Sequence, residues 1–161
     1  YIGADRGESD NESIVSLAQP KVFVNGDWLI AYSGNLGNGQ LLQFISLPAV
    51  GEDDDPFKLL RMDIVEDLKS YIDSYGSEPD ENNQTDILVG CKGRLFEMTM
   101  GDWGVAEIKE TAIGSGGTFA LGSLNTTHNL PIPIVDRIEL ALKAAITYSP
   151  TCQGPYDILS I

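Results

Sequence analysis

The chain has 161 residues, 42% of them hydrophobic, which predicts one globular domain over residues 1–161 rather than a disordered chain. No apolar run approaches the roughly 18 residues of a membrane-spanning helix, so we expect no membrane partner. Twenty-four acidic against ten basic residues give a net charge of −14, which repels phosphate backbones and argues against nucleic acid as a partner.

The first elements predicted along the chain are strands. Residues 1–5 predict the later half of a strand, and residues 21–24 predict a short one. The Asn25-Gly26 pair that follows is a strong hairpin signal because it lies between apolar runs. Residues 28–32 form the returning strand. They are almost wholly apolar, which predicts burial on both faces.

Two helices and a three-stranded meander come next. The first helix is predicted over roughly residues 39–47. The second has an apolar stripe at three- and four-residue steps, made of Phe57, Leu60, Ile64, Leu68, Tyr71 and Ile72. Residues 74–84 are polar and rich in turn formers, which predicts a loop. The three strands are predicted at residues 86–91, 94–99 and 105–108.

The last third of the chain predicts two helices and a final strand. One helix follows residues 113–117, the other spans about residues 134–148 after Pro133, and the strand covers residues 156–161. Strands and helices that occur in groups argue against a parallel βαβ sheet. We therefore predict an α+β fold, a four-layer αββα sandwich in which two antiparallel sheets stack face to face with a helix pair outside each.

Charge distribution and cysteine use bear on metals and location. Twelve of the acidic residues lie between Glu52 and Asp86, which predicts a solvated helix face with acidic loops. The alternative is a docking surface or a divalent-cation site at residues 52–55, although the run lacks the glycine and spacing of a calcium loop. Cys91 and Cys152 have no metal-ligand spacing and predict free thiols in a reducing compartment.

Four short stretches, in order along the chain, carry a resemblance to one family. They are Gly3-Ala4-Asp5-Arg6, Lys21-Val22-Phe23, Ala31-Tyr32-Ser33-Gly34 and Ala112-Ile113-Gly114-Ser115-Gly116-Gly117. The separation between Asp5 and Lys21 also matches the family. The chain resembles the β-type subunits of the proteasome and, more closely, the HslV-type peptidase subunit of the bacterial two-component ATP-dependent protease. Both are N-terminal nucleophile hydrolases, and both have the four-layer fold predicted above.

The resemblance implies a threonine peptidase. In this family the first residue of the mature chain, a threonine, attacks the peptide carbonyl, and its own α-amine serves as the base. We expect that threonine upstream of Tyr1, on a first strand missing from this sequence. Lys21 is expected to lower the pKa of the amine and to stabilise the oxyanion, and Asp5 to pair with Lys21. Ser115 is expected to hydrogen-bond the amine, and no cofactor or metal is implied.

Further residues are assigned around the substrate by the same resemblance. The backbone N–H of Gly34 is expected to face the oxyanion, the other interpretation being that this glycine only ends a strand. Ser115 has a second interpretation as a helix N-cap. Substrate contacts are assigned to Gly7, Glu8, Ser9, Phe23 and Ala31. The first three offer an edge to which an extended peptide adds as a strand, and the last two line an apolar pocket, unless the acidic Glu8 selects basic residues.

One stretch departs from the family pattern. Family members usually have Asp-x-x-Ser-Gly before the last strand, where this chain has the run Ser149-Pro150-Thr151-Cys152-Gln153. Ser149 then takes the place of the aspartate and Cys152 that of the serine as supporting residues, or the alignment slips across Pro150. In the first case neither residue carries a full negative charge, so the support of the threonine is altered.

The function that the resemblance implies is a threonine-type peptidase subunit of a self-compartmentalising, homo-oligomeric ring. Its substrate would be peptide or unfolded protein, its partner an ATPase unfoldase, and its location cytoplasmic. The alternative is a catalytically inactive structural or assembly subunit of the same fold. A third possibility is another N-terminal nucleophile hydrolase that acts on small amides.

Overall fold

A five-stranded antiparallel sheet occupies the centre of the molecule in a computed structural model that describes residues 1–9, 12–77 and 84–161. Its strands lie side by side in chain order: β4 Val22–Asn25, β5 Trp28–Gly34, β6 Thr85–Cys91, β7 Arg94–Met100 and β8 Val105–Ile108. Each pair of neighbours is antiparallel, and the β4–β5 and β6–β7 pairs are tight hairpins. The predicted meander is confirmed.

A smaller antiparallel pair forms the second sheet layer. Strand β1, Ile2–Asp5, pairs with β9, Tyr156–Leu159, near the end of the chain. Strands β2, Gly7–Ser9, and β3, Ile14–Ser16, form a separate hairpin that the sequence did not predict. Each strand has only three residues, and Val15 and Ser16 are exposed, so the pair shows no alternating apolar pattern.

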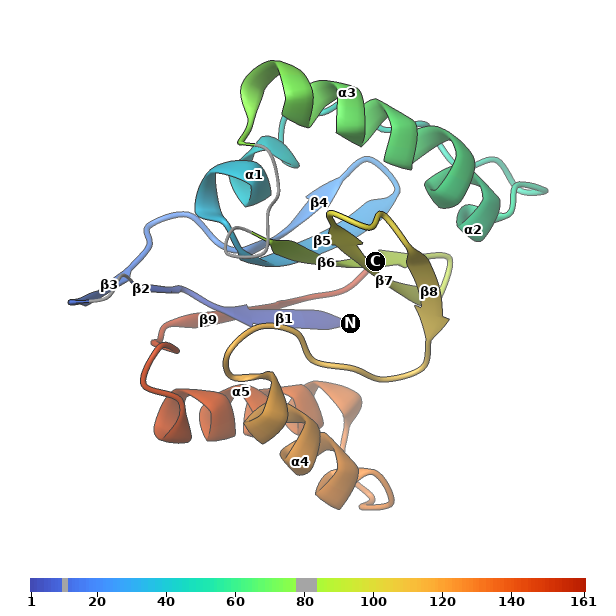
Figure 1. Cartoon of the computed structure of the whole chain (residues 1–161). Coiled ribbons are helices and arrows are strands. Elements are labelled where there is room, and N and C mark those ends of the chain that lie inside the picture. Colours follow the sequence, from blue (N-terminus) through green and yellow to red (C-terminus); the bar gives the residue numbers. More distant parts are fainter. Residues whose placement is uncertain (10–11, 78–83) are drawn as a thin grey trace.

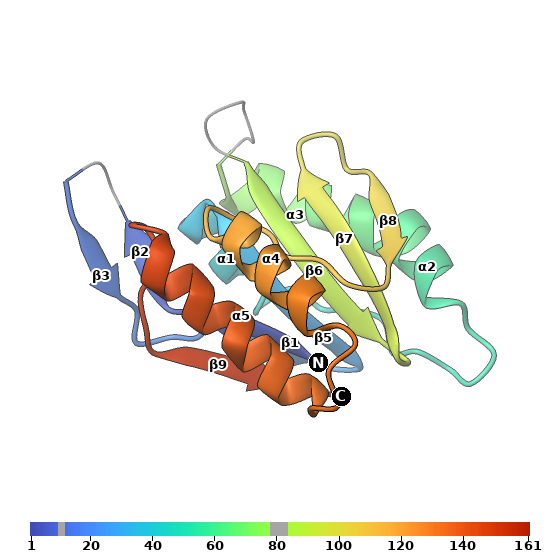
Figure 2. The ribbon, with the colours of Figure 1, turned by 90° about the horizontal axis from the view of Figure 1, so that it is seen from below.

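Helices cover the outer face of each sheet layer (Figure 1). On the five-stranded sheet lie α1 Leu36–Leu41 and one long helical stretch made of α2 Pro56–Leu59, the π-helical turn Leu60–Ile64 and α3 Val65–Tyr75. On the other side lie α4 Gly117–Thr127 and α5 Ile134–Tyr148. Figure 2 shows α5 against β1 and β9, with α4 beside α5. The predicted αββα sandwich is therefore confirmed.

The central sheet is buried on both faces. In β5, Trp28, Ile30 and Tyr32 pack among the helices α1 to α3, while Leu29 and Ala31 face the β1 side. All five of these side chains are at most 4% exposed, as the apolar run predicted. Each fully buried side chain of this size stabilises the fold by about 1.5–3 kcal/mol, so this strand is central to folding stability.

The first helix was predicted with the wrong limits. It begins at Leu36 rather than near residue 39 because the side chain of Asn35 accepts a hydrogen bond from the N–H of Asn38 at 2.7 Å and so caps it. The apolar residues that suggested a helix to residue 47 lie partly in the turns after Leu41. The last strand likewise ends at Leu159, two residues early. No helix in the described ranges is long and apolar enough to cross a membrane.

Candidate active site

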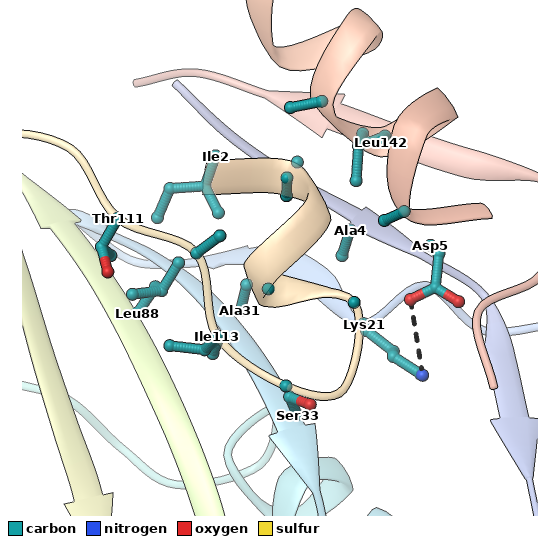
Figure 3. A pocket seen from close by; sticks show the side chains of 18 of the residues that line it. Ile2, Ala4, Asp5, Lys21, Ala31, Ser33, Leu88, Thr111, Ile113 and Leu142 are labelled. Atoms are coloured by element: carbon teal, nitrogen blue, oxygen red, sulfur yellow. Dashed lines mark ion pairs between the residues drawn. The ribbon is translucent and has the colours of Figure 1, made fainter. Parts of the chain in front are cut away.

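A cavity of about 150 Å³ lies between the central sheet and the helices α4 and α5, alongside β1. Most of its wall is apolar and comes from several layers: Ile2, Leu88, Leu95, Ile113, Leu124 and Leu142. Asp5 and Lys21 bring opposite charges to one part of the wall (Figure 3). Within the described residues, β1 pairs only with β9, so the other edge of β1 has no strand partner there.

An ion pair joins two of the predicted catalytic residues. The ammonium of Lys21 lies 3.7 Å from Oδ1 of Asp5, and their side chains are 12% and 18% exposed. Lys21 also donates a hydrogen bond to the backbone carbonyl of Gly7. The other carboxylate oxygen of Asp5 accepts from the N–H of Gly7 at 2.8 Å and from that of Gln153 at 2.9 Å. These bonds fix Asp5, so the lysine is held in place.

Glycine at position 7 makes this arrangement possible. A β-carbon there would lie 2.6 Å from the backbone nitrogen of Gln153 and 2.7 Å from the carboxylate of Asp5. Any larger residue would push β2 away from the C-terminal segment and break the bonds that hold Asp5. Gly7 therefore has a structural role beside the substrate edge assigned to it.

Ser115 is not a helix cap. Helix α4 begins at Gly117, Gly116 occupies the N-cap position, and no side-chain cap bond is formed. The Ser115 hydroxyl instead accepts a hydrogen bond from Thr151 at 2.6 Å. Ser115 lines the same cavity as Asp5 and Lys21, so the structure brings the three predicted catalytic residues to one cavity.

Gly34 ends β5 in a conformation that requires glycine. Its φ angle is +99°, and a β-carbon would lie 2.1 Å from the carbonyl oxygen of Gln84. The interpretation as a strand end is therefore sufficient to explain the glycine. The predicted role at the oxyanion stays a prediction.

Glu8 contributes a half-buried acid near the ion pair. Burial raises the pKa of its carboxyl above the ordinary value; the positive charge of Lys21 opposes this shift and the negative charge of Asp5 adds to it. Burial, helped by the charge of Glu8, also raises the pKa of the Tyr32 phenol to about 12. Glu8, Lys21 and Tyr32 therefore interact electrostatically.

The remaining predicted residues divide into two groups. Ala31 and Cys152 line the cavity, and Ser149 lies behind it, buried at the end of α5. Phe23 instead packs among the helices on the opposite face of the central sheet, and Ser9 pairs with Ile14 in the β2–β3 hairpin. Neither of these two residues is among those that line the cavity.

Thr151 is the site residue that sequence reasoning missed. The family pattern directed attention to Ser149 and Cys152, on either side of it. In the structure Thr151 reaches Ser115, and its hydroxyl lies 3.1 Å from that of Ser149. A single threonine in a loop has no motif or spacing signal, so nothing in the sequence distinguished it.

Solved structures share this architecture at low sequence identity. BPH of Thiobacillus denitrificans in complex with epoxomicin has a TM-score of 0.79 and 20% identity, over 96% of this chain and 88% of that one. HslV of Trypanosoma brucei has a TM-score of 0.68 and 17% identity, also over 96% of this chain and 88% of that one. Anbu, an ancestral beta-subunit from Yersinia bercovieri, has a TM-score of 0.57 and 14% identity, over 96% of this chain and 73% of that one.

The chain has the HslV and proteasome-like fold. No protein-family model matches the sequence, and no curated protein matches it. At 14 to 20% identity the likeness concerns the fold alone. The proteasome-like fold accounts for the order of layers around the cavity, whereas the chemistry must be argued from the side chains that line it.

Proposed function

We propose that the protein is a threonine-type peptidase subunit. One observation carries the proposal: Asp5, Lys21 and Ser115, from three separate segments, meet at one cavity in a proteasome-like fold. Surface ion pairs are common and often without function. This one is mostly buried, is fixed by two backbone N–H groups and lines the same cavity as Ser115, which fits a catalytic ion pair better than a solvated surface pair.

The nucleophile in this proposal is an N-terminal threonine that precedes Tyr1. The strand that bears it pairs with the edge of β1 opposite β9 and fills the apolar cavity beside α4. Two features support this: the unpaired edge of β1 within the described residues and the apolar lining of Leu88, Leu95 and Ile113. A strand there would bury its side chains and satisfy the β1 backbone.

The reaction is acyl transfer to the threonine oxygen. The free α-amine, whose ordinary pKa is about 7.7–8.0, takes the hydroxyl proton as Oγ attacks the peptide carbonyl. Lys21 keeps the amine neutral by like-charge repulsion and stabilises the oxyanion, together with the Gly34 N–H. The amine then returns its proton to the leaving peptide nitrogen, and water hydrolyses the ester. No metal or cofactor takes part in these steps.

Substrate peptide binds in an extended form along β2. Glu8 and Ser9 offer backbone groups, since β2 pairs only with β3 among the described residues. Gly7 was assigned to the same edge, but its N–H and its carbonyl already bond to Asp5 and Lys21. Ala31 lines the cavity wall, whereas Phe23 packs on the opposite face of the sheet and takes no part in the pocket. Glu8, half-buried beside Lys21, favours a basic substrate side chain over an acidic one.

The subunit assembles with copies of itself into a ring in the cytoplasm, fed with unfolded protein by an ATPase partner. The α4–α5 face supports an interface between copies. Helix α4 contains no charged residue, yet Phe119 and Leu121 on it are 40% and 41% exposed. Exposed apolar surface of this kind is typical of protein interfaces.

The decisive experiment uses the mature protein purified from its natural source. Its N-terminal residue is sequenced, and cleavage of fluorogenic peptides is compared for the recombinant wild type, Lys21→Ala and the control Lys109→Ala, an exposed lysine after β8. Loss of the ammonium is expected to lower kcat/KM at least about 100-fold, with the control unchanged. A first residue other than Thr, Ser or Cys, or full activity of Lys21→Ala, would refute the proposal.

A second candidate function is an inactive structural subunit of the same assembly. The observation that favours it is the uncharged support behind Ser115, where Ser149, Thr151 and Cys152 supply no carboxylate. A mature N-terminus without a nucleophile, combined with intact assembly, would favour this candidate.

A further inference from the structure

Three hydroxyl groups form a chain that ends at the cavity. The hydroxyls of Ser149 and Thr151 are 3.1 Å apart, and Thr151 donates to Ser115 at 2.6 Å. Ser115 and Thr151 both line the cavity, whereas Ser149 is only 5% exposed. The chain therefore runs from the protein interior to the cavity wall.

The direction of the hydrogen bonds follows from the count of protons. A hydroxyl has one proton to donate and two lone pairs that accept. The Thr151 hydroxyl donates its one proton to Ser115. In the bond between Thr151 and Ser149, Ser149 is therefore the donor and Thr151 the acceptor. Ser115 accepts with one lone pair and keeps its own proton and its second lone pair for a group in the cavity.

The buried end of this chain is well anchored. Ser149 is the C-cap of α5, and its N–H donates to the carbonyl of Ala145 at 2.8 Å. A β-carbon at Gly116 would lie 2.5 Å from Sγ of Cys152 and 2.9 Å from the side chain of Ala145. This close approach seats the loop of Ser115 directly on the end of α5, within reach of Thr151.

A carboxylate in the position of Thr151 would act differently. An ionised carboxylate only accepts hydrogen bonds, so the Ser115 hydroxyl would donate to it and would present only lone pairs to the cavity. Thr151 donates instead, and Ser115 can then accept a proton with one lone pair while it releases its own to another group. Such an arrangement suits a hydroxyl that passes a proton on.

We propose that Thr151 is a positioning residue, which holds the Ser115 hydroxyl with its proton and one lone pair toward the reacting amine. Ser149 behind it fixes the direction of the chain. Neutral hydroxyls thereby replace the carboxylate support that the resemblance led us to expect. The inference rests on the proposed peptidase function, because only that function places an amine beside Ser115.

The test compares five variants in the mature, full-length protein. Thr151→Val keeps the shape and removes the hydroxyl, whereas Thr151→Ser keeps the hydroxyl. We expect Thr151→Val to lower kcat about 10- to 100-fold with KM nearly unchanged. Thr151→Ser should retain most of the wild-type kcat. In a Ser115→Ala background, Thr151→Val should cause no further loss. Thr147→Val, an exposed threonine of α5 whose hydroxyl donates to the Lys143 carbonyl, is the matched control.

Several results would overturn the inference. These are an unchanged kcat in Thr151→Val, a failure of Thr151→Ser to retain most of the wild-type kcat, or a loss that adds to that of Ser115→Ala. A wild type without peptidase activity would refute the proposed function instead. The hydroxyl chain is then judged by thermal unfolding of the same variants: non-additive shifts in Tm for Ser115→Ala and Thr151→Val support the coupling, and additive shifts refute it.

Discussion

At the scale of single residues, Glu8 links the site to folding stability. Burial raises the pKa of its carboxyl, so the folded protein binds this proton more tightly than the unfolded chain does. Its contribution to stability is complete below the unfolded pKa and is lost as the pH rises through the folded pKa. The ionised form of Glu8 is therefore less favourable to the fold than the protonated form, which is a cost that the proposed preference for basic substrates would explain.

Replacement of Glu8 by glutamine should remove this cost. We expect Glu8→Gln to have a higher Tm than the wild type at pH 7, with a difference that shrinks as the pH is lowered toward about 4, near the ordinary pKa of a glutamate. Thermal unfolding followed by circular dichroism across that range measures it. Glu52→Gln, in an exposed loop, controls for the loss of one negative charge. A difference that is constant with pH, or negative at pH 7, would contradict the argument.

The residues proposed for the site were predictable to different degrees for physical reasons. Asp5 and Lys21 lie in stretches that resemble the family. They form an ion pair because the strands β1 and β4, which lead to them, are adjacent in the fold. Thr151 could not be predicted, since its contact with Ser115 depends on how closely α4 and α5 approach. That distance is set by Gly116, and a tertiary contact of this kind leaves no pattern in the sequence.

At the scale of elements, the backbone is tightly constrained at the end of β5. Gly34 has a φ angle of +99° and lies against the Gln84 carbonyl. Gly26, in the β4–β5 turn, has a φ angle of +60°, and a β-carbon added there would have no atom within 4 Å. A comparison of the two glycines therefore distinguishes the energetic cost of a positive φ angle from that of a steric clash.

Alanine at each position should reveal that difference. Gly26→Ala is expected to lower the free energy of unfolding by about 1–2 kcal/mol, the cost of a left-handed conformation. Gly34→Ala adds a steric contact with Gln84 and should lower it further, by several kcal/mol in total. Chemical denaturation gives both values. Equal losses in the two variants would show that the β5 end relaxes without cost.

Elements with strong periodicity were predicted well, and those governed by local contacts were not. Helix α5 was found with its limits, because its apolar stripe and Pro133 define it. Helix α1 was misplaced because its start depends on the Asn35 cap and its middle on the Tyr32 ring, which Gly39 must clear. The hairpin of β2 and β3 was missed since it buries too little to show a pattern.

At the scale of the whole molecule, the layers follow from covering both faces of one sheet. The apolar run of β5 predicted that other elements must pack on both faces of the central sheet. The helices, which occur in two groups along the chain, form the outer layers. What the sequence did not indicate is that the apolar helix α4 keeps part of its surface exposed. Phe119 and Tyr148 pack there with ring centroids 5.9 Å apart and ring planes tilted by 35°, beside a shallow groove between α4 and α5.

We predict that this surface holds copies of the subunit together. Phe119→Lys places a charge in an apolar contact, which cannot be buried without a partner, and should reduce the mass of the assembly in light scattering. Phe44→Lys is the matched control, because Phe44 is 73% exposed and follows α1 on the opposite helix layer. If Phe44→Lys dissociates the assembly and Phe119→Lys does not, the contact between copies lies on the α1–α3 side and the assignment to α4 and α5 is wrong.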